Sequence, residues 1–180
     1  MQCLWFFLNR EYIKHAAKCT FMLPGVKIFE LKKNIDERGL FTEILRTDWA
    51  TQILDENKIL QANISISYPG VIRAWHRHQR GQIDFFLTID GSIKLCAYDE
   101  ERHELDQIVS SGEQFQLVRI PGHYWHGFKN VGDRTCTVIY FVNKLYDYNN
   151  PDEERRPWND PEIIDNKTNK PFDWNKPPYG

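Results

Sequence analysis

Histidines gather in two short segments of this 180-residue chain, which holds six histidines in all. The first segment, GVIRAWHRH, contains His76 and His78, whose i, i+2 spacing puts both side chains on one face of a strand. The second, IPGHYWHGF, contains His123 and His126. A single histidine in a strand is usually structural, but two dense segments with apolar neighbours predict a shared pocket. Imidazoles in a pocket can transfer protons or bind a transition-metal ion.

Short strands must position these histidines, because turn residues recur at short, even spacing from Pro24 onward. Residues 47–56 are the only stretch that predicts a short helix, with Thr47 and Asp48 as capping residues. Many short strands between Gly, Pro and Asp turns are typical of a sandwich or barrel, so we predict an all-β fold. Alternating or apolar stretches predict strands over residues 26–31, 40–46, 59–67, 71–76, 82–90, 92–98, 114–120, 125–129 and 135–143.

Composition and charge exclude several classes of protein. The net charge is −2 and the pI is about 6.3, so we expect no nucleic-acid partner. No apolar run approaches the ~18 residues of a membrane span, and the N-terminal apolar run is a poor secretion signal. The four cysteines form no CxxC pair and are expected to be free thiols. We therefore predict a soluble, cytoplasmic protein without a membrane partner.

Three regions of the chain differ in character. Residues 1–21 precede the regular alternation, and we expect an extension there. Residues 22–149 contain all the predicted strands and are expected to form one domain. Residues 150–180 contain six prolines and little periodicity. A tail of that composition is disordered when it is free, but its aromatic residues predict that it packs on the barrel as an irregular segment.

Two groups of residues resemble the motifs of cupins. Cupins fold as a jelly roll, also called a double-stranded β-helix, so the resemblance implies this form of the all-β fold, with one short helix and an irregular C-terminal tail. The first motif is matched by Gly70, His76, His78, Asp84 and Gly91, and the second by Pro121, His126 and Asn130.

Within the cupins, five segments resemble dTDP-4-dehydrorhamnose 3,5-epimerases. They occur in the order seen in that family, and the resemblance covers about residues 23–174. Membership would imply a homodimer. The segments are DERGLFTE (36–43), QANISIS (61–67), GVIRAWH (70–76), IPGHYWHGF (120–128) and PDEERRPWNDPE (151–162).

The resemblance implies a reaction and a role for each matching residue. The substrate is a nucleotide-linked 4-keto-6-deoxyhexose. Epimerisation removes a proton from a carbon next to the ketone and returns one to the opposite face, without a cofactor. His76 corresponds to the base and Tyr140 to the acid. The resemblance implies nucleotide contacts from Arg38, Glu43, Gln61 and Asn63, contacts near the sugar from Arg73, His78, Asp84 and His126, and closure by Glu153 or Glu154 and Tyr146 or Tyr148.

Two departures from the family leave alternatives open. Asp84 stands where the family usually has a lysine that helps to hold the enolate, and His78 replaces a glutamine. Together with His76 and His126, these residues match the three-histidine, one-carboxylate set of metal cupins. A metal-dependent enzyme that uses Fe, Mn, Ni or Zn is therefore a second hypothesis. A third is a non-catalytic sugar-binding cupin, which binds its ligand without proton exchange.

Overall fold

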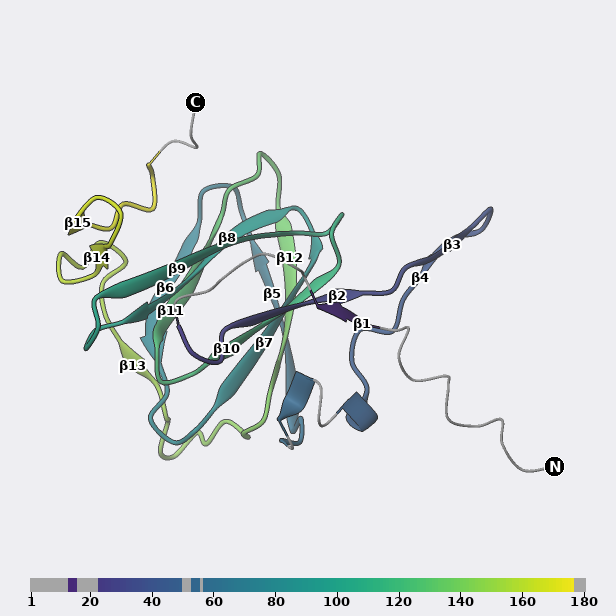
Figure 1. Ribbon diagram of the computed structural model, residues 1–180, viewed down its shortest axis with the longest axis horizontal. Helices are drawn as coiled ribbons and strands as arrows, with labels where there is room; N and C mark the ends of the chain where they lie inside the picture. The colour runs from purple at the N-terminus through teal and green to yellow at the C-terminus, as the bar shows by residue number, and fades with distance from the viewer. Residues whose placement is uncertain (1–12, 16–22, 50–52, 56, 177–180) are drawn as a thin grey trace.

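The computed structural model describes residues 13–15, 23–49, 53–55 and 57–176 (Figure 1). Most of its strands belong to two antiparallel sheets that pack face to face. The six-stranded sheet has the order β1 (Ile13–His15), β2 (Lys27–Leu31), β10 (Gln116–Pro121), β7 (Ile83–Asp90), β12 (Cys136–Val142) and β5 (Gln61–Ser67). The five-stranded sheet has the order β13 (Glu154–Arg155), β6 (Ile72–Arg77), β11 (Trp125–Asn130), β8 (Ser92–Asp99) and β9 (Glu104–Ser111). Two hairpins are formed by β3 (Asn34–Asp36) with β4 (Gly39–Phe41) and by β14 (Ile164–Asp165) with β15 (Lys170–Pro171).

Strand β7 shows how the core is divided between the two faces of the six-stranded sheet. Phe86 points to the space between the sheets, whereas Phe85 and Leu87 point to the opposite side, because side chains alternate along a strand. All three are buried, because the second sheet covers Phe86, while Trp49 and Ile53 cover the outer face with Phe85 and Leu87. A strand with apolar cover on both faces loses the polar–apolar alternation of a half-exposed strand.

The C-terminal segment packs on the outer face of the five-stranded sheet. Trp75 of β6 lies against Phe172 and Trp174, with ring centroids 5.8 Å and 4.8 Å apart, respectively. All three rings are buried, and the segment lies at the opposite end of the molecule from the β3–β4 hairpin (Figure 1). Up to residue 176, the described part of this segment therefore packs on the outer face of the five-stranded sheet through buried aromatic rings.

The all-β jelly-roll prediction is confirmed, and most predicted strands coincide with strands of the structure. The helix expected over residues 47–56 lies partly outside the described residues, at positions 50–52 and 56. The described residues there hold a 3-10 turn, η1 (Thr47–Trp49), and a π-helical pair at residues 53–54. Asp55 has a φ of 47°, in the left-handed region that an α-helix cannot continue through. Strand β9 was not predicted; it follows the charged turn and pairs with β8 along its whole length.

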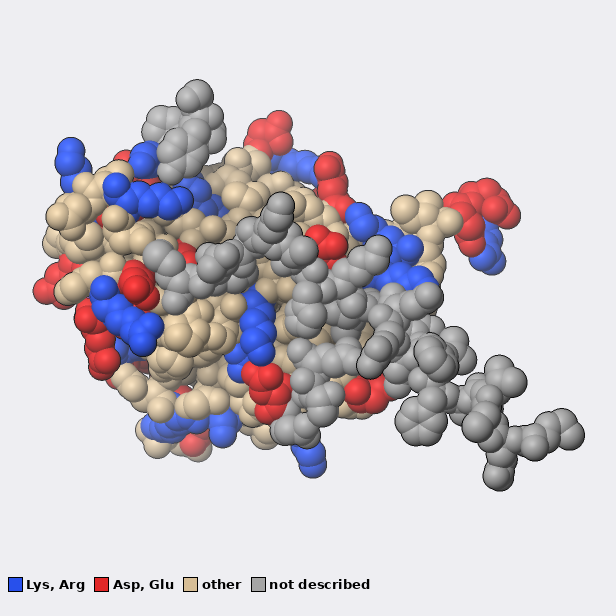
Figure 2. Space-filling model, in the orientation of Figure 1, with Lys and Arg blue, Asp and Glu red and all other residues tan. Residues whose placement is uncertain are grey.

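The expected N-terminal extension falls mostly outside the described residues, at positions 1–12 and 16–22. Its described part, Ile13–His15, forms β1 and pairs with β2 at the edge of the six-stranded sheet. Within the described part of the chain, no helix is long and apolar enough to cross a bilayer. On the face shown in Figure 2, acidic and basic side chains are interspersed, in keeping with the small net charge.

Candidate active site

A cavity of about 810 Å³ lies between the two sheets. Its walls come from both sheets and from the C-terminal segment, which closes one side of it. The alternatives Tyr148 and Glu153 also line this space. The other predicted site residues that line it are Gln61, Asn63, Arg73, His76, His78, Asp84, Tyr140 and Tyr146.

Three histidines meet at one wall of the cavity. Strand β6 carries His76 and is followed at once by His78, while β11 places His126 directly opposite His76. The ring centroids of His76 and His126 are 4.2 Å apart, and His78 lies 5.8 Å from His76 and 5.7 Å from His126. His126 is fully buried behind the cavity surface. His123, the fourth histidine of the two segments, is exposed and outside this cluster.

A β-bulge orients this wall. The pairing of β6 with β11 shifts register between His126 and Phe128, so that two residues of β6 lie opposite Gly127. The extra residue turns both Arg73 and His76 to the cavity, although side chains three positions apart point to opposite sides of a regular strand. Gly127 is required at this position. A Cβ there would lie 2.3 Å from the Ala74 Cβ and 2.6 Å from the Arg73 carbonyl oxygen.

Backbone carbonyls fix the tautomers of two of the imidazoles. The Nδ1 of His126 lies 2.8 Å from the carbonyl oxygen of Tyr124, and the Nδ1 of His78 contacts the carbonyl oxygen of Asp152. Because a carbonyl oxygen can only accept, both Nδ1 atoms carry a proton, and in the neutral form of each ring Nε2 presents the lone pair. The Oδ2 of Asp84 lies 3.5 Å from the Nε2 of His126 and 4.0 Å from that of His78.

Burial sets the charges of this group. Burial, together with the charges of His78 and Arg155, lowers the pKa of His76 to about 3. Burial and the neighbouring His76 hold the pKa of His126 well below its ordinary value. Both rings are therefore neutral at pH 7, with a nitrogen that can accept a proton. Burial also raises the pKa of Asp84 to about 6, against the lowering effects of His78 and of a hydrogen bond from Gln82.

Tyr140 reaches the cavity from the other sheet. Its ring, on β12, stacks on Phe86 with centroids 5.7 Å apart. Burial raises the pKa of the Tyr140 hydroxyl, and the nearby carboxyl groups of Asp84 and Glu153 raise it further. The phenol is therefore protonated at pH 7 and can donate. A neutral imidazole on one wall and a phenol on the opposite wall can act on the two faces of one carbon atom.

Comparisons with known proteins show which family the chain belongs to. A family model described as polysaccharide biosynthesis C-terminal domain matches residues 34–154. A probable low-salt glycan biosynthesis epimerase of Haloferax volcanii is 41% identical over 141 residues, which make up 76% of this chain and 88% of that protein. A dTDP-4-dehydrorhamnose 3,5-epimerase of Methanothermobacter thermautotrophicus is 30% identical over 148 residues, 78% of each chain. The chain belongs to the dTDP-4-dehydrorhamnose 3,5-epimerase family.

The fold of this family agrees with the structure. A solved dTDP sugar isomerase of Desulfovibrio desulfuricans aligns with a TM-score of 0.72 at 25% identity, over 87% of this chain and 94% of that one. The family predicted from the sequence motifs is thereby confirmed, and membership makes the chain an enzyme of the isomerase class.

Amides and tyrosines form the end of the cavity next to β5. Gln61 donates from Nε2 to Asn63 Oδ1 at 2.8 Å and accepts at Oε1 from the backbone N–H of Tyr146 at 2.9 Å. The rings of Tyr146 and Tyr148 meet edge to face, 5.0 Å apart. In this epimerase-family chain, the contact of Gln61 with the Tyr146 backbone therefore positions the tyrosine pair. The side chains of Gln61 and Asn63 both line the cavity.

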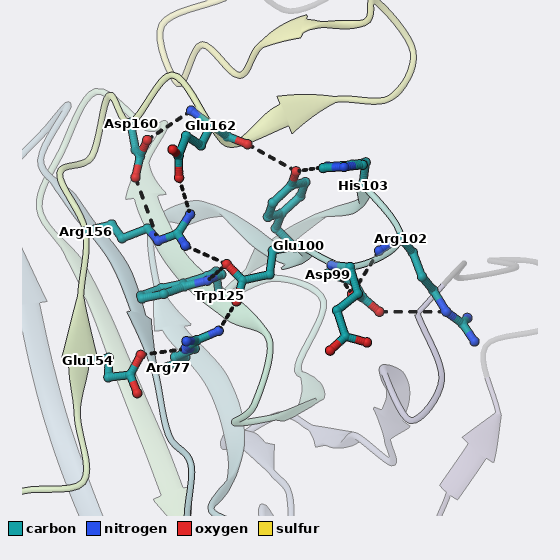
Figure 3. Close-up of polar contacts among 12 residues, drawn as sticks. Arg77, Asp99, Glu100, Arg102, His103, Trp125, Glu154, Arg156, Asp160 and Glu162 are labelled. Carbon is teal, nitrogen blue, oxygen red and sulfur yellow. Dashed lines mark hydrogen bonds and ion pairs between the residues drawn. The ribbon is translucent and has the colours of Figure 1, made fainter.

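The C-terminal wall of the cavity is held by a network around Glu100 (Figure 3). Glu100 accepts hydrogen bonds from Arg77, from Arg156 at 2.5 Å and from the indole N–H of Trp125 at 3.0 Å. The two guanidinium groups lie over the Trp125 ring, 4.4 Å and 4.3 Å from its centroid, one above and one below the indole in Figure 3. This network fastens β13 and the residues after it to β6.

Three predicted site residues lie away from the cavity. Arg38 is exposed at the tip of the β3–β4 hairpin and pairs with Asp36, while Glu43 pairs with Arg46. This hairpin projects from the two sheets (Figure 1). Glu154 pairs with Arg77 on the outside, so that Glu153, and not Glu154, is the acidic residue of this segment that lines the cavity.

Sequence analysis missed two cations of the cavity wall. Arg155 and Arg156 both line it, and β13 places Arg155 opposite His76. Their signal was present in the segment PDEERRPWNDPE, whose two adjacent arginines were taken only as part of a family match. Asp152 was missed as well. Its backbone carbonyl accepts from His78 and its carboxylate from the backbone N–H groups of Gln79 and Arg80.

Proposed function

We propose that the chain epimerises a nucleotide-linked 4-keto-6-deoxyhexose at a carbon next to the keto group. The observation that carries this proposal is the placement of His76 and Tyr140 on opposite walls of one cavity. The neutral His76 imidazole takes the proton from the carbon next to the ketone, which becomes an enolate. The Tyr140 hydroxyl then gives a proton to the opposite face of that carbon, and the configuration is inverted.

Arg73 is the residue that we propose to hold the charge of the enolate or of the diphosphate. Its guanidinium donates to the Ser67 hydroxyl at 2.9 Å and to the Ile66 carbonyl oxygen at 3.2 Å. Both partners are uncharged, so no described carboxylate neutralises this cation at the cavity wall. A preorganised cation next to developing negative charge lowers the barrier to proton abstraction.

The nucleotide is proposed to occupy the end of the cavity near β5. The amides of Gln61 and Asn63 can pair with the edge of a base, and the rings of Tyr146 and Tyr148 offer a surface for stacking. The carboxylate of Glu153 and the guanidinium of Arg155 border the same space.

Neither Arg38 nor Glu43 lines the cavity of its own chain, and the β3–β4 hairpin projects from the two sheets, so their predicted nucleotide contacts call for a second copy of the chain. We therefore propose a homodimer in which the β3–β4 hairpin reaches the partner's cavity. Its apolar Phe41 is 67% exposed, and Ile64 of the edge strand β5 is 65% exposed. Edge strands with exposed apolar residues pair readily with another chain. The buried free thiols Cys96 and Cys136 fit a reducing compartment such as the cytoplasm.

Proton exchange tests the proposed reaction. The protein is incubated in deuterated water with a panel of nucleotide-linked 4-keto-6-deoxyhexoses, and deuterium is followed at carbons 3 and 5 of the sugar by NMR. Solvent deuterium at either carbon, together with inversion there, is the expected result. Exchange at one carbon or at both distinguishes a single from a double epimerase. Tight binding of a substrate without any exchange would reject the reaction and leave a sugar-binding protein.

A further inference from the structure

We infer that Ser67 is a positioning residue, which holds the guanidinium of Arg73 in place at the cavity wall. Arg73 lines the cavity and is exposed. A long, exposed arginine side chain samples many rotamers, so holding it in one orientation costs conformational entropy. The Nε–H of Arg73 donates to the Ser67 hydroxyl at 2.9 Å, and Nη2 donates to the Ile66 carbonyl oxygen at 3.2 Å. These two contacts orient the guanidinium before a substrate binds.

The same contacts decide which N–H groups of Arg73 are left for a ligand. A guanidinium carries five N–H donors in one plane. Strand β5 takes the edge that is formed by Nε and Nη2. Among the described residues, the N–H groups of Nη1 make no hydrogen bond. The Nη1 end of the guanidinium is therefore available to oxygen atoms of a ligand, such as those of a diphosphate.

Ser67 is a firm anchor because it is buried and its backbone is paired. It is the last residue of β5, is 2% exposed and lies opposite Cys136 of β12. Its carbonyl oxygen accepts a hydrogen bond from the side chain of Asn130 at 3.0 Å. Neither Ser67 nor Asn130 lines the cavity. Ser67 therefore acts on a substrate through its hydrogen-bonded neighbour in the cavity wall, which is Arg73.

Asn130 fixes the crossover that brings Ser67 and Arg73 together. The chain leaves the six-stranded sheet after Ser67 and enters the five-stranded sheet with β6. Between the two strands, the Asn130 carbonyl oxygen accepts from the Gly70 N–H at 3.1 Å, and the Asn130 N–H donates to the Val71 carbonyl oxygen at 3.0 Å. Gly70 and Asn130, which match the two cupin motifs, thus hold the ends of β5 and β6 in one geometry.

The inference rests on the proposed function for the charge that Arg73 stabilises, but the contact between Ser67 and Arg73 does not. A cation that is already oriented stabilises developing charge without reorganisation during the reaction. Loss of the Ser67 hydroxyl should let the guanidinium move, and activity should fall although no residue of the cavity wall has been changed.

A double-mutant cycle tests this role. Ser67→Ala should lower kcat/KM for the proposed epimerisation about tenfold, because a hydrogen bond to a charged group contributes that much. In an Arg73→Ala background the same change should have no further effect, since its route to the substrate has been removed. Dissociation constants for dTDP, measured by calorimetry on the same four proteins, give a second cycle that needs no reaction.

Ser110→Ala is the matched control for the loss of a buried hydroxyl. Ser110 is buried like Ser67 and its hydroxyl lies 2.9 Å from that of Thr88, but it does not line the cavity. This variant should lose about as much melting temperature as Ser67→Ala and keep the kcat/KM of wild type. Ser67→Thr, which retains the hydroxyl, should keep most of the activity.

The Arg73 Nε–H signal reports the contact without any ligand. In ¹⁵N NMR it is assigned by its loss in Arg73→Lys, and its exchange with water should be at least about fivefold faster in Ser67→Ala. Unchanged exchange overturns the inference, as does an equal loss of activity from Ser67→Ala with and without Arg73. Wild type that catalyses no epimerisation but shows faster exchange in Ser67→Ala and coupled dTDP binding would reject the proposed reaction and support the role of Ser67.

Discussion

At the scale of single residues, the two proposed proton-transfer groups are free to act. Among the described residues neither the His76 imidazole nor the Tyr140 hydroxyl makes a hydrogen bond or an ion pair, and the two approach the cavity from different sheets. Side chains that are packed but not hydrogen-bonded can be replaced with little loss of stability beyond their packing. Substitution at these positions should therefore affect chemistry more than folding.

His76→Ala should lower kcat by about 100-fold or more, because general-base catalysis contributes that much in enzymes. The melting temperature should change little, since His76 lies on the cavity wall and β6 keeps its pairing with β11. Turnover and melting are measured on the same preparation, with His123→Ala as the control. Activity within a few-fold of wild type would remove His76 from the mechanism.

Tyr140→Phe should separate proton removal from proton return. The phenyl ring keeps its stacking on Phe86, and only the hydroxyl is lost. Deuterium exchange from solvent into the substrate should persist, while formation of the inverted product should fall by about 100-fold. NMR follows both quantities in one sample. An equal loss of exchange and product, or no loss of either, would contradict the role of Tyr140 as the acid.

At the scale of elements, a bulge and an added strand shape the cavity. The register shift between β6 and β11 turns Arg73 and His76 to the same side, and β13 extends the five-stranded sheet next to His76. Neither the bulge nor β13 supplies the proposed base or acid, but both decide where the side chains on β6 lie. Changes in these elements should therefore affect the activity through geometry.

Gly127→Ala should destabilise the fold by about 1–3 kcal/mol, because overpacking forces the backbone of β6 to move. The added Cβ would meet the Ala74 Cβ at 2.3 Å. Urea unfolding measures the loss, and kcat should fall as well, since the displaced backbone carries His76. Gly132→Ala is the matched control, because its Cβ would find its nearest atom at 3.5 Å. Equal stability of the two variants would contradict this account of the bulge.

Glu100→Gln should loosen the C-terminal wall of the cavity. It removes the charge that pairs with Arg77 and Arg156, a loss of about 1 kcal/mol because the group is partly screened by solvent. KM should rise more than kcat falls, and a protease should cut after residue 150 more quickly. Glu162→Gln is the control within the same network, since Glu162 is exposed and holds Arg156 at 3.4 Å. Equal effects of the two variants would argue against a central role for Glu100.

Low pH should loosen the C-terminal wall of the cavity in the same way as Glu100→Gln. Burial raises the pKa of Glu100, but hydrogen bonds from Trp125 and Arg77 outweigh it and hold the pKa below its ordinary value of 4.5. The lower pKa belongs to the folded state, so this stabilisation is complete above pH 4.5 and is lost as the pH falls below it. Proteolysis of the C-terminal segment should accelerate over that range in wild type and much less in Glu100→Gln.

At the scale of the whole molecule, the proposed site is divided between two chains. The cavity holds the proposed base and acid, whereas Arg38, on the projecting β3–β4 hairpin, and Glu43, just after it, do not line the cavity. In the proposed dimer, the hairpin of the partner brings these two residues to the nucleotide. A dimer of this kind would couple the activity of each site to assembly.

Mixing two impaired variants tests the proposed shared site. Arg38→Ala and His76→Ala should each be impaired alone, but a mixed dimer contains one site with an intact His76 and an intact Arg38 from the partner. Unfolding and refolding the two together should therefore restore part of the activity, and ultracentrifugation should show a dimer. Activity that stays at the level of the separate variants, or a monomer at catalytic concentrations, would contradict the shared site.

The sequence by itself determined most strands and the chemical groups of the site. Alternation and turn residues are local signals, and they predicted β2, β5, β6, β7, β8, β10, β11 and β12 within a few residues. The capped stretch after Thr47 has helical spacing, and its described residues 47–49 and 53–54 form helical turns whose apolar side chains cover the outer face of a sheet.

Only the tertiary structure decided which groups meet. His76 and His126 face each other across β6 and β11, and Asp84 joins His78 and His126 from the second sheet. No local spacing encodes these contacts, because packing of two sheets sets which strands oppose one another. The same holds for Arg155, which enters the site through the pairing of β13 with β6. Residue types are a property of the sequence, but charge, tautomer and distance arise from burial and from partners distant in the chain.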